Sequence, residues 1–131
     1  MPALPTEFYD LFEKATFAHV TTINPDGTPH ATPVWIDYDP ESERLLVNTE
    51  RERRKERNVD ANPSVAISMT DPDDPYRYLS VTGEVTAVTT EGAREHIETL
   101  AQRYMGQEYP SPIETERVIL RIRPDEVLTG G

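Results

Sequence analysis

The stretch Asn48-Thr49-Glu50-Arg51-Glu52-Arg53-Arg54-Lys55-Glu56-Arg57-Asn58 joins a predicted strand to a predicted helix and carries the strongest signal in the chain. Five of the 13 basic residues lie between positions 51 and 57, and with two glutamates they give this segment a net charge of +3. The rest of the chain holds eight basic and 22 acidic residues, so the whole chain has a formal net charge of −11. A single cationic segment on an acidic protein predicts a bound anion, most simply a phosphate group.

The composition predicts one folded domain over residues 1–131, located in the cytoplasm. The length suffices for a single core, and the absence of cysteine excludes disulfides and thiolate chemistry. No segment approaches the roughly 18 apolar residues of a membrane helix, and the first residues lack the features of a signal peptide. The acidic balance argues against nucleic-acid binding. Because an acidic surface keeps a protein soluble in salt, we interpret the source as halophilic, with an ordinary acidic cytosolic protein as the alternative.

Alternation of apolar residues and turn signals divides most of the chain into short strands. The turn Asn24-Pro25-Asp26-Gly27 has proline and glycine where a tight turn favours them. The prolines at 29 and 33 cannot donate to a strand ladder, so the second strand is expected at an edge, at a bulge or against a ligand. The six predicted strands span residues 17–23, 28–38, 44–49, 64–70, 77–89 and 117–123.

Three short helical segments complete the prediction. An apolar stripe begins at Phe8 and ends at Ala15, and a second helix is expected over residues 53–62. Thr90 is expected to cap a third helix, and Gly106 is expected to end it. Six strands joined by tight turns predict a mainly β fold, in which a six-stranded antiparallel sheet curls into a barrel with the helices outside.

The cationic segment lies where a helix N-terminus is predicted, and such a terminus binds phosphate through free N–H groups and its dipole. Arg54 and Lys55 would stand in the first turn, where positive charge opposes the dipole and therefore contributes nothing to helix stability. The alternative is a solvated helix face with acid–base pairs such as Glu50 with Arg54.

One segment resembles the phosphate-binding segment of the pyridoxamine 5′-phosphate oxidase-like flavoproteins. In it, Asn48-Thr49 is followed after four residues by Arg54-Lys55 and then by Asn62-Pro63. Three further stretches resemble the same family in the same order, so that the likeness covers residues 10–127. They are a hairpin at residues 21–30, a strand under the flavin ring at residues 33–37 and a long central strand at residues 76–85.

Within this family the chain is most similar to the deazaflavin group that uses coenzyme F420, through residues 71–78 and 103–110. F420 carries an anionic oligoglutamate tail beyond its phosphate, and Arg51, Arg53 and Arg57 exceed the needs of one phosphate. FMN is the competing cofactor, because the Arg-Lys pair suits both. The oxidases proper carry a C-terminal segment that this sequence does not show after its last predicted strand, so vitamin B6 oxidation is not expected.

The resemblance implies a split β-barrel homodimer that holds its cofactor in a groove between subunits and acts on a small organic molecule. The cofactor supplies the redox chemistry, so we predict no catalytic side chain and no metal site. Among the residues near the expected cofactor, Trp35 could equally be a core residue, Thr49 a plain strand residue and Tyr78 a cross-strand packing residue. His30, near the expected ring strand, is a weaker candidate for a proton donor or substrate contact, with an ordinary strand histidine as the alternative. The resemblance implies cofactor contacts from Pro33, Val34, Trp35, Ile36, Asn48, Thr49, Arg53, Arg54, Lys55, Arg57 and Tyr78.

The leading functional hypothesis is an F420-dependent oxidoreductase that moves a hydride between reduced F420 and a small acceptor. Alternatives are an FMN-dependent oxidoreductase of the same family and a non-catalytic binding protein for flavin, deazaflavin or haem. A third alternative is a cofactor-free dimer whose cationic segment contacts an acidic protein. No nucleic-acid or membrane partner is expected.

Overall fold

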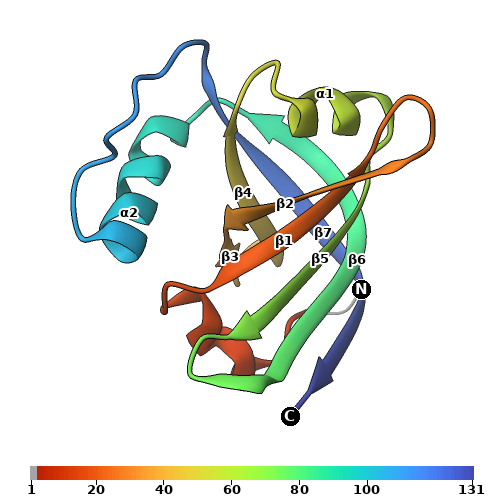
Figure 1. Ribbon diagram of the computed structural model, residues 1–131, viewed down its shortest axis with the longest axis vertical. Coiled ribbons are helices and arrows are strands. Elements are labelled where there is room, and N and C mark those ends of the chain that lie inside the picture. Colours follow the sequence, from red (N-terminus) through yellow and green to blue (C-terminus); the bar gives the residue numbers. More distant parts are fainter. Residues whose placement is uncertain (1–2) are drawn as a thin grey trace.

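The protein is a curled antiparallel sheet with helices at its ends, seen in a computed structural model that describes residues 3–131 (Figure 1). The mainly β, split-barrel prediction is confirmed, but the predicted count of six strands is wrong, because the sheet has seven, in the order β2-β1-β5-β6-β7-β4-β3. Along the chain the elements are η1 (Thr6–Phe12), β1 (Phe17–Ile23), β2 (Pro29–Trp35), β3 (Asp37–Asp39), β4 (Arg44–Glu50), α1 (Arg54–Ala61), β5 (Ser64–Asp71), β6 (Asp74–Thr89), α2 (Ala93–Met105) and β7 (Arg117–Gly130).

The extra strand arises because the predicted strand 28–38 divides at Ile36. Before this residue β2 pairs with β1, and after it β3 pairs with β4. The two strands therefore lie at opposite ends of the strand order although one residue separates them in the chain. Pro29 and Pro33 lie on β2, an edge strand where a missing N–H costs no ladder bond, as the sequence predicted.

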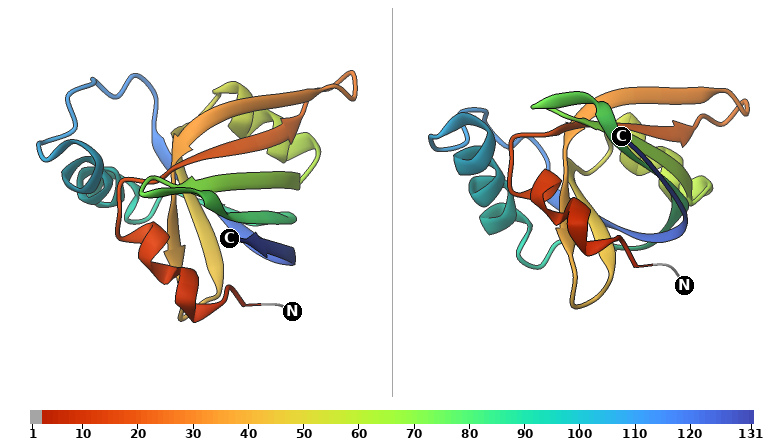
Figure 2. Two further views of the ribbon diagram at one scale, coloured as in Figure 1. Left: turned by 60° about the horizontal axis from the view of Figure 1, so that its bottom comes forward. Right: turned by 90° about the horizontal axis from the view of Figure 1, so that it is seen from below.

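The core fills the concave side of the sheet. Figure 2 shows the curl of the sheet from two further directions. Val118, Leu120 and Ile122 of β7 are fully buried, as their alternation predicted. They pack with apolar side chains of β1, β4, β5 and β6 and with Leu11 and Phe12 of η1. The long pairing of β6 with β7 carries two register shifts, and such bulges increase local twist and let the sheet curl.

The helices differ from prediction mainly at their ends. The first predicted helix is the short 3-10 segment η1 rather than an α-helix through Ala15. The expectation that Thr90 caps α2 is wrong, because the N-cap is Gly92, which adopts φ +74° and provides no side-chain oxygen. Gly106 ends α2 in the left-handed conformation, with φ +68°, as expected. Among residues 3–131, no helix combines the length and apolar character needed to cross a membrane.

A cluster of charged side chains fastens η1 to the β5–β6 hairpin. Asp71 is only 5% exposed, and its carboxylate accepts hydrogen bonds from the Asp73 N–H, Lys14 Nζ and Arg77 Nη1 at 2.8, 2.9 and 2.7 Å. Arg77 also donates to both carboxylate oxygens of Asp10, at 2.8 and 2.9 Å. These bonds hold the pKa of Asp71 well below its ordinary value of 3.8, through the Asp73 N–H first and then through Lys14 and Arg77.

This cluster predicts a specific acid sensitivity for an Arg77→Met variant. A carboxylate with a lowered pKa in the folded state stabilises the fold fully above its unfolded pKa, and that contribution is lost as the pH falls through the folded pKa. Removing Arg77 should therefore lower the free energy of unfolding at pH 7 and also flatten its decline between pH 4 and pH 2. Urea unfolding at a series of pH values measures both effects. Arg94→Met, an exposed change of equal charge on α2, is the control, and parallel curves for wild type and Arg77→Met would contradict the assignment.

Candidate functional site

The site begins at the turn between β4 and α1, where the backbone is arranged to leave N–H groups free. Glu52 adopts φ +73°, and its N–H donates to the Glu56 Oε1 at 2.8 Å. Arg53 is the N-cap of α1 and makes no side-chain capping bond. Among residues 3–131, no acceptor is bonded to the first-turn N–H groups of Arg54 and Lys55. A helix N-terminus of this kind favours an anion.

A cavity of about 240 Å³ opens beside this turn. It lies between the end of β2, the strands β4 and β7, and the helix α2 with the loop that follows it. Its walls therefore bring together the edge strand β2 and the neighbouring strands β7 and β4 near the other end of the strand order. The lining residues are Phe17, Pro33, Val34, Trp35, Asn48, Thr49, Arg53, Lys55, Ile97, Tyr109 and Arg117.

Lys55 is the cation at the α1 end of the cavity. Its Nζ donates to the Thr32 Oγ1 of β2 at 3.1 Å, and no carboxylate of a described residue lies within ion-pair distance. Burial, and secondarily the charge of Arg53, lower the pKa of Lys55. An anion placed here would relieve both effects, which is the expected property of a phosphate-binding lysine.

Aromatic side chains form the opposite wall. Trp35 stacks on Tyr104 of α2, with ring centroids 5.1 Å apart and planes at 12°. Tyr109 meets Trp35 edge to face at 6.2 Å, and Phe17 meets Tyr104 in the same manner at 5.5 Å. One face of Trp35 is thus covered by the protein's own tyrosine, and Trp35, Tyr109 and Phe17 line the cavity with aromatic surface of the kind that ligand rings pack against.

Glu50 attaches the loop between α2 and β7 to the cationic turn. Its Oε1 accepts hydrogen bonds from the N–H groups of Glu114 and Thr115 at 3.0 and 2.9 Å, and these bonds lower its pKa, the one from Thr115 most. Arg51 donates from Nε to the Glu116 Oε1 at 2.8 Å. This attachment holds the loop that carries Tyr109 over the cavity.

Three polar residues connect β4 and β7 to α2 behind this wall. Arg117, only 4% exposed, donates from Nε to the Asn48 Oδ1 at 2.8 Å. The Asn48 Nδ2 lies 2.8 Å from the Ala93 carbonyl oxygen and 3.1 Å from the His96 Nδ1. Sequence reasoning placed Asn48 in the site but missed Arg117, Tyr109, Phe17 and Ile97. Strand alternation puts Arg117 on the face opposite Val118, which was the one available signal.

Seven of the eleven predicted contact residues line the cavity: Pro33, Val34, Trp35, Asn48, Thr49, Arg53 and Lys55. The other four lie elsewhere. Ile36 is fully buried, with its N–H donating to the Tyr104 hydroxyl at 3.0 Å. Arg54 borders a separate open cleft with Asn24, Pro25, Asp26 and His30. Arg57 is exposed on α1, and Tyr78 pairs with Thr70 and Gly130.

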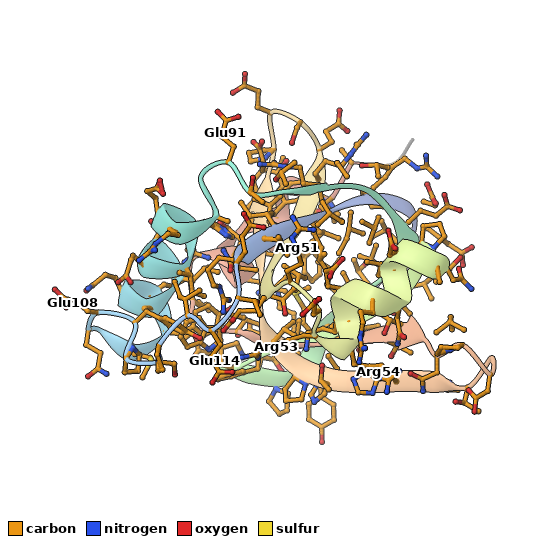
Figure 3. The ribbon with its side chains drawn as sticks, turned by 90° about the horizontal axis from the view of Figure 1, so that it is seen from above. Arg51, Arg53, Arg54, Glu91, Glu108 and Glu114 are labelled. Atoms are coloured by element: carbon orange, nitrogen blue, oxygen red, sulfur yellow. The ribbon has the colours of Figure 1, made fainter. Side chains whose placement is uncertain are left out.

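Figure 3 shows how the turn divides its arginines. Arg53 lies on the side of α1 that faces Glu114, and Arg54 lies on the side of the β1–β2 hairpin. Arg53 is the N-cap and has an extended backbone (φ −68°, ψ 160°), so its side chain is placed before the helical phase of α1 begins at Arg54. The cavity therefore receives Arg53 and Lys55 rather than the adjacent pair Arg54-Lys55.

Comparisons with known proteins agree with this architecture. The family model described as pyridoxamine 5′-phosphate oxidase matches residues 4–129. The chain belongs to this family. The chain is similar to a solved structure titled F420 reductase, with 36% identity, a TM-score of 0.82 and coverage of 95% of this chain and 98% of that one. The predicted family resemblance is therefore confirmed.

Solved structures of lower identity share the fold of this pyridoxamine 5′-phosphate oxidase family protein. A conserved hypothetical protein from Mycobacterium tuberculosis is 22% identical with a TM-score of 0.75, over 99% of this chain and 86% of that one. A putative pyridoxamine 5′-phosphate oxidase from Listeria innocua is 23% identical with a TM-score of 0.62, over 86% of each chain. No curated protein matches the sequence.

Proposed function

We propose that this protein is an F420-dependent oxidoreductase that reduces or oxidises a small organic molecule. The observation that carries the proposal is the cavity in which a helix N-terminus and Lys55, which has no carboxylate partner among residues 3–131, accompany an aromatic wall. The 36% identity to a protein titled F420 reductase, over nearly the whole of both chains, supports the choice of cofactor.

The residues present fit such a cofactor. Lys55, Arg53, Thr49 and the free N–H groups of α1 would hold its phosphate, because each supplies a donor or a positive charge at one end of the cavity. Pro33, Val34 and Trp35 would lie along its ring, since the edge strand β2 leaves backbone groups unpaired there. Bound in this way, a deazaflavin supplies two-electron redox chemistry, and the protein supplies binding, orientation and electrostatics.

The choice of F420 over FMN rests on cations outside the cavity. Arg54 and Arg57 are exposed on the first turns of α1, beyond the lining that Lys55 and Arg53 provide. A ligand that ends at its phosphate leaves them unused, whereas an oligoglutamate tail leaving the phosphate would pass them. FMN is the second candidate, because the residues that line the cavity would bind the phosphate of FMN as well as that of F420.

We further propose that the working form is a homodimer that completes the cavity. Phe17 is 54% exposed although it lines the cavity, and large apolar side chains are also exposed on β6 and β7, namely Tyr76, Tyr78 and Leu128. Exposed apolar surface of this kind is typical of protein–protein contacts. A second copy of the chain would bury this apolar surface. It could also bring residues such as Tyr78, which lie outside the cavity of their own chain, to the cavity of the partner.

Titration of the purified protein with F420 and with FMN tests the proposed function, in low salt and in concentrated KCl. Saturable binding of F420, tighter than that of FMN, with a change in the cofactor's absorbance or fluorescence is the expected result. Tighter binding of FMN would move the protein to the second candidate, and binding of neither would refute the proposal. Stable binding with no turnover of any acceptor would identify a carrier or sensor rather than an enzyme.

A further inference from the structure

Arg117 is a buried cation that the phosphate-binding role leaves unexplained. Its side chain is 3% exposed, it stands at the start of β7, and it borders the cavity. Nε donates to the Asn48 Oδ1 at 2.8 Å, and Nη1 donates to the Tyr109 hydroxyl at 3.4 Å. Among residues 3–131, no acceptor bonds to Nη2. A largely buried guanidinium with an unused donor at the border of a cavity is available to an acceptor on a ligand in that cavity.

The orientation of this guanidinium is fixed from behind by a relay of hydrogen bonds. The Asp37 Oδ2 can only accept, at 2.9 Å, so the His96 Nε2 carries the proton in that bond. The His96 Nδ1 then accepts from the Asn48 Nδ2, which also donates to the Ala93 carbonyl. The remaining atom of the amide, Oδ1, is thereby directed at Arg117. Asn48 and His96 are positioning residues that act through Arg117.

The charge of Arg117 is poorly compensated by the protein. The nearest carboxylate oxygen is the Glu50 Oε2, at 3.8 Å from Nη1, and Glu50 also lies 3.5 Å from Arg53 and accepts N–H groups of the loop. One carboxylate thus faces two arginines. Burying a cation without a full partner is costly, so a ligand that brings negative charge to this wall would be favoured.

The surroundings of Arg117 point to the ring of a ligand rather than to its phosphate. Its guanidinium carbon lies 5.3 Å from the centre of the Tyr109 ring, which in turn meets Trp35. Lys55, by contrast, is bonded to Thr32 on β2. Arg117 therefore adjoins the aromatic wall and shares the Glu50 carboxylate with Arg53, whereas Lys55 contacts β2 instead.

We propose that Arg117 recognises the negative charge that two-electron reduction places on the pyrimidine part of a flavin or deazaflavin ring. The inference rests on the proposed function, because it requires such a cofactor in the cavity. Arg117 would bind the reduced cofactor more tightly than the oxidised one and would thereby raise the cofactor's reduction potential. A positive charge beside this part of the ring is a recognised means by which proteins tune such cofactors.

The test compares wild type with Arg117→Gln and Arg117→Lys. We expect Arg117→Gln to weaken binding of the reduced cofactor about tenfold more than binding of the oxidised cofactor, which corresponds to a potential lowered by about 30 mV. Arg117→Lys, which keeps the charge, should recover part of the difference. Arg94→Met, an exposed change of equal charge, should leave both affinities unchanged. Dissociation constants for F420 and FMN in both redox states, with the midpoint potential, provide the readout.

Several outcomes would overturn the inference. Arg117 would be assigned to the phosphate end if Arg117→Gln weakened the binding of the oxidised and reduced cofactor equally. The same assignment would follow if this variant no longer bound inorganic phosphate in the absence of cofactor. An unchanged potential in a folded Arg117→Gln protein would show that the guanidinium does not face the ring. If wild type binds neither cofactor, the proposed function fails and the inference fails with it. If wild type binds one normally, only the role of Arg117 is rejected.

Discussion

Replacement of Lys55 by methionine is expected to weaken F420 binding by roughly 10- to 100-fold. The ammonium is half-buried, and among residues 3–131 it bonds to the Thr32 hydroxyl alone and has no carboxylate within ion-pair distance. A charge-assisted hydrogen bond to a phosphate contributes about 1.5–3 kcal/mol, which corresponds to this range of affinity. Fluorescence titration with F420, and with FMN for comparison, measures the change.

The same experiment tests how α1 divides its basic residues. Arg54→Met removes an equal charge from the neighbouring position, but Arg54 borders the open cleft beside His30 rather than the cavity. Arg54→Met should weaken F420 binding less than Lys55→Met does, and it should leave FMN binding unchanged, because FMN has no anionic tail. Arg94→Met on α2 is the control for net charge. Equal losses for Lys55→Met and Arg94→Met would show that general electrostatics, and not a contact in the cavity, sets the affinity.

Replacement of Gly83 by alanine is expected to destabilise the fold by about 3 kcal/mol or to prevent folding. Gly83 pairs with Pro124 at a register shift between β6 and β7. A Cβ at this position would lie 2.0 Å from the Arg123 carbonyl oxygen and 3.3 Å from the Pro124 Cα, so backbone atoms would have to move. Urea unfolding followed by circular dichroism measures the loss of stability.

The neighbouring Thr82→Ala provides the matched comparison. Thr82 is exposed, and exposed substitutions of this kind usually change stability by less than about 0.5 kcal/mol. A Gly83→Ala protein as stable as Thr82→Ala would mean that the bulge can relax at little cost. The close approach of the two strands would then not be needed to curl the sheet.

The parts of this protein that could be predicted from sequence are those determined by neighbours along the chain. The turn at residues 24–27, the alternation in β7 and the passage from strand to helix after Glu50 each depend on a few consecutive residues. Lys55 was predicted in this way, and it lines the cavity. Ile36 and Arg54 were assigned as sequence neighbours of Trp35 and Lys55, whereas the division of the strand at Ile36 and the N-cap position of Arg53 decide which side chains reach the cavity.

The parts that could not be predicted depend on long-range pairing. Arg117 reaches the site because β7 pairs with β4 so that Arg117 lies opposite Glu50, 67 positions earlier in the chain. Tyr109 reaches it because Glu50 anchors a loop that has no regular structure of its own. His96 meets Asn48 only because α2 packs on the outer side of β4. These contacts cannot be predicted from a single sequence, because they depend on how distant segments pack in the folded protein.

The division at Ile36 also determines how the cavity can change its width. The edge strands β2 and β3 are joined by the chain itself at this residue and by no ladder of hydrogen bonds. The two ends of the sheet are thus connected through the backbone at Ile36, and β2 and β3 form no β-ladder with each other. Among residues 3–131, the Lys55–Thr32 hydrogen bond is the one side-chain hydrogen bond that joins β2 to α1. The mouth of the cavity can therefore widen around a ligand at the expense of side-chain contacts while every backbone ladder of the sheet stays intact.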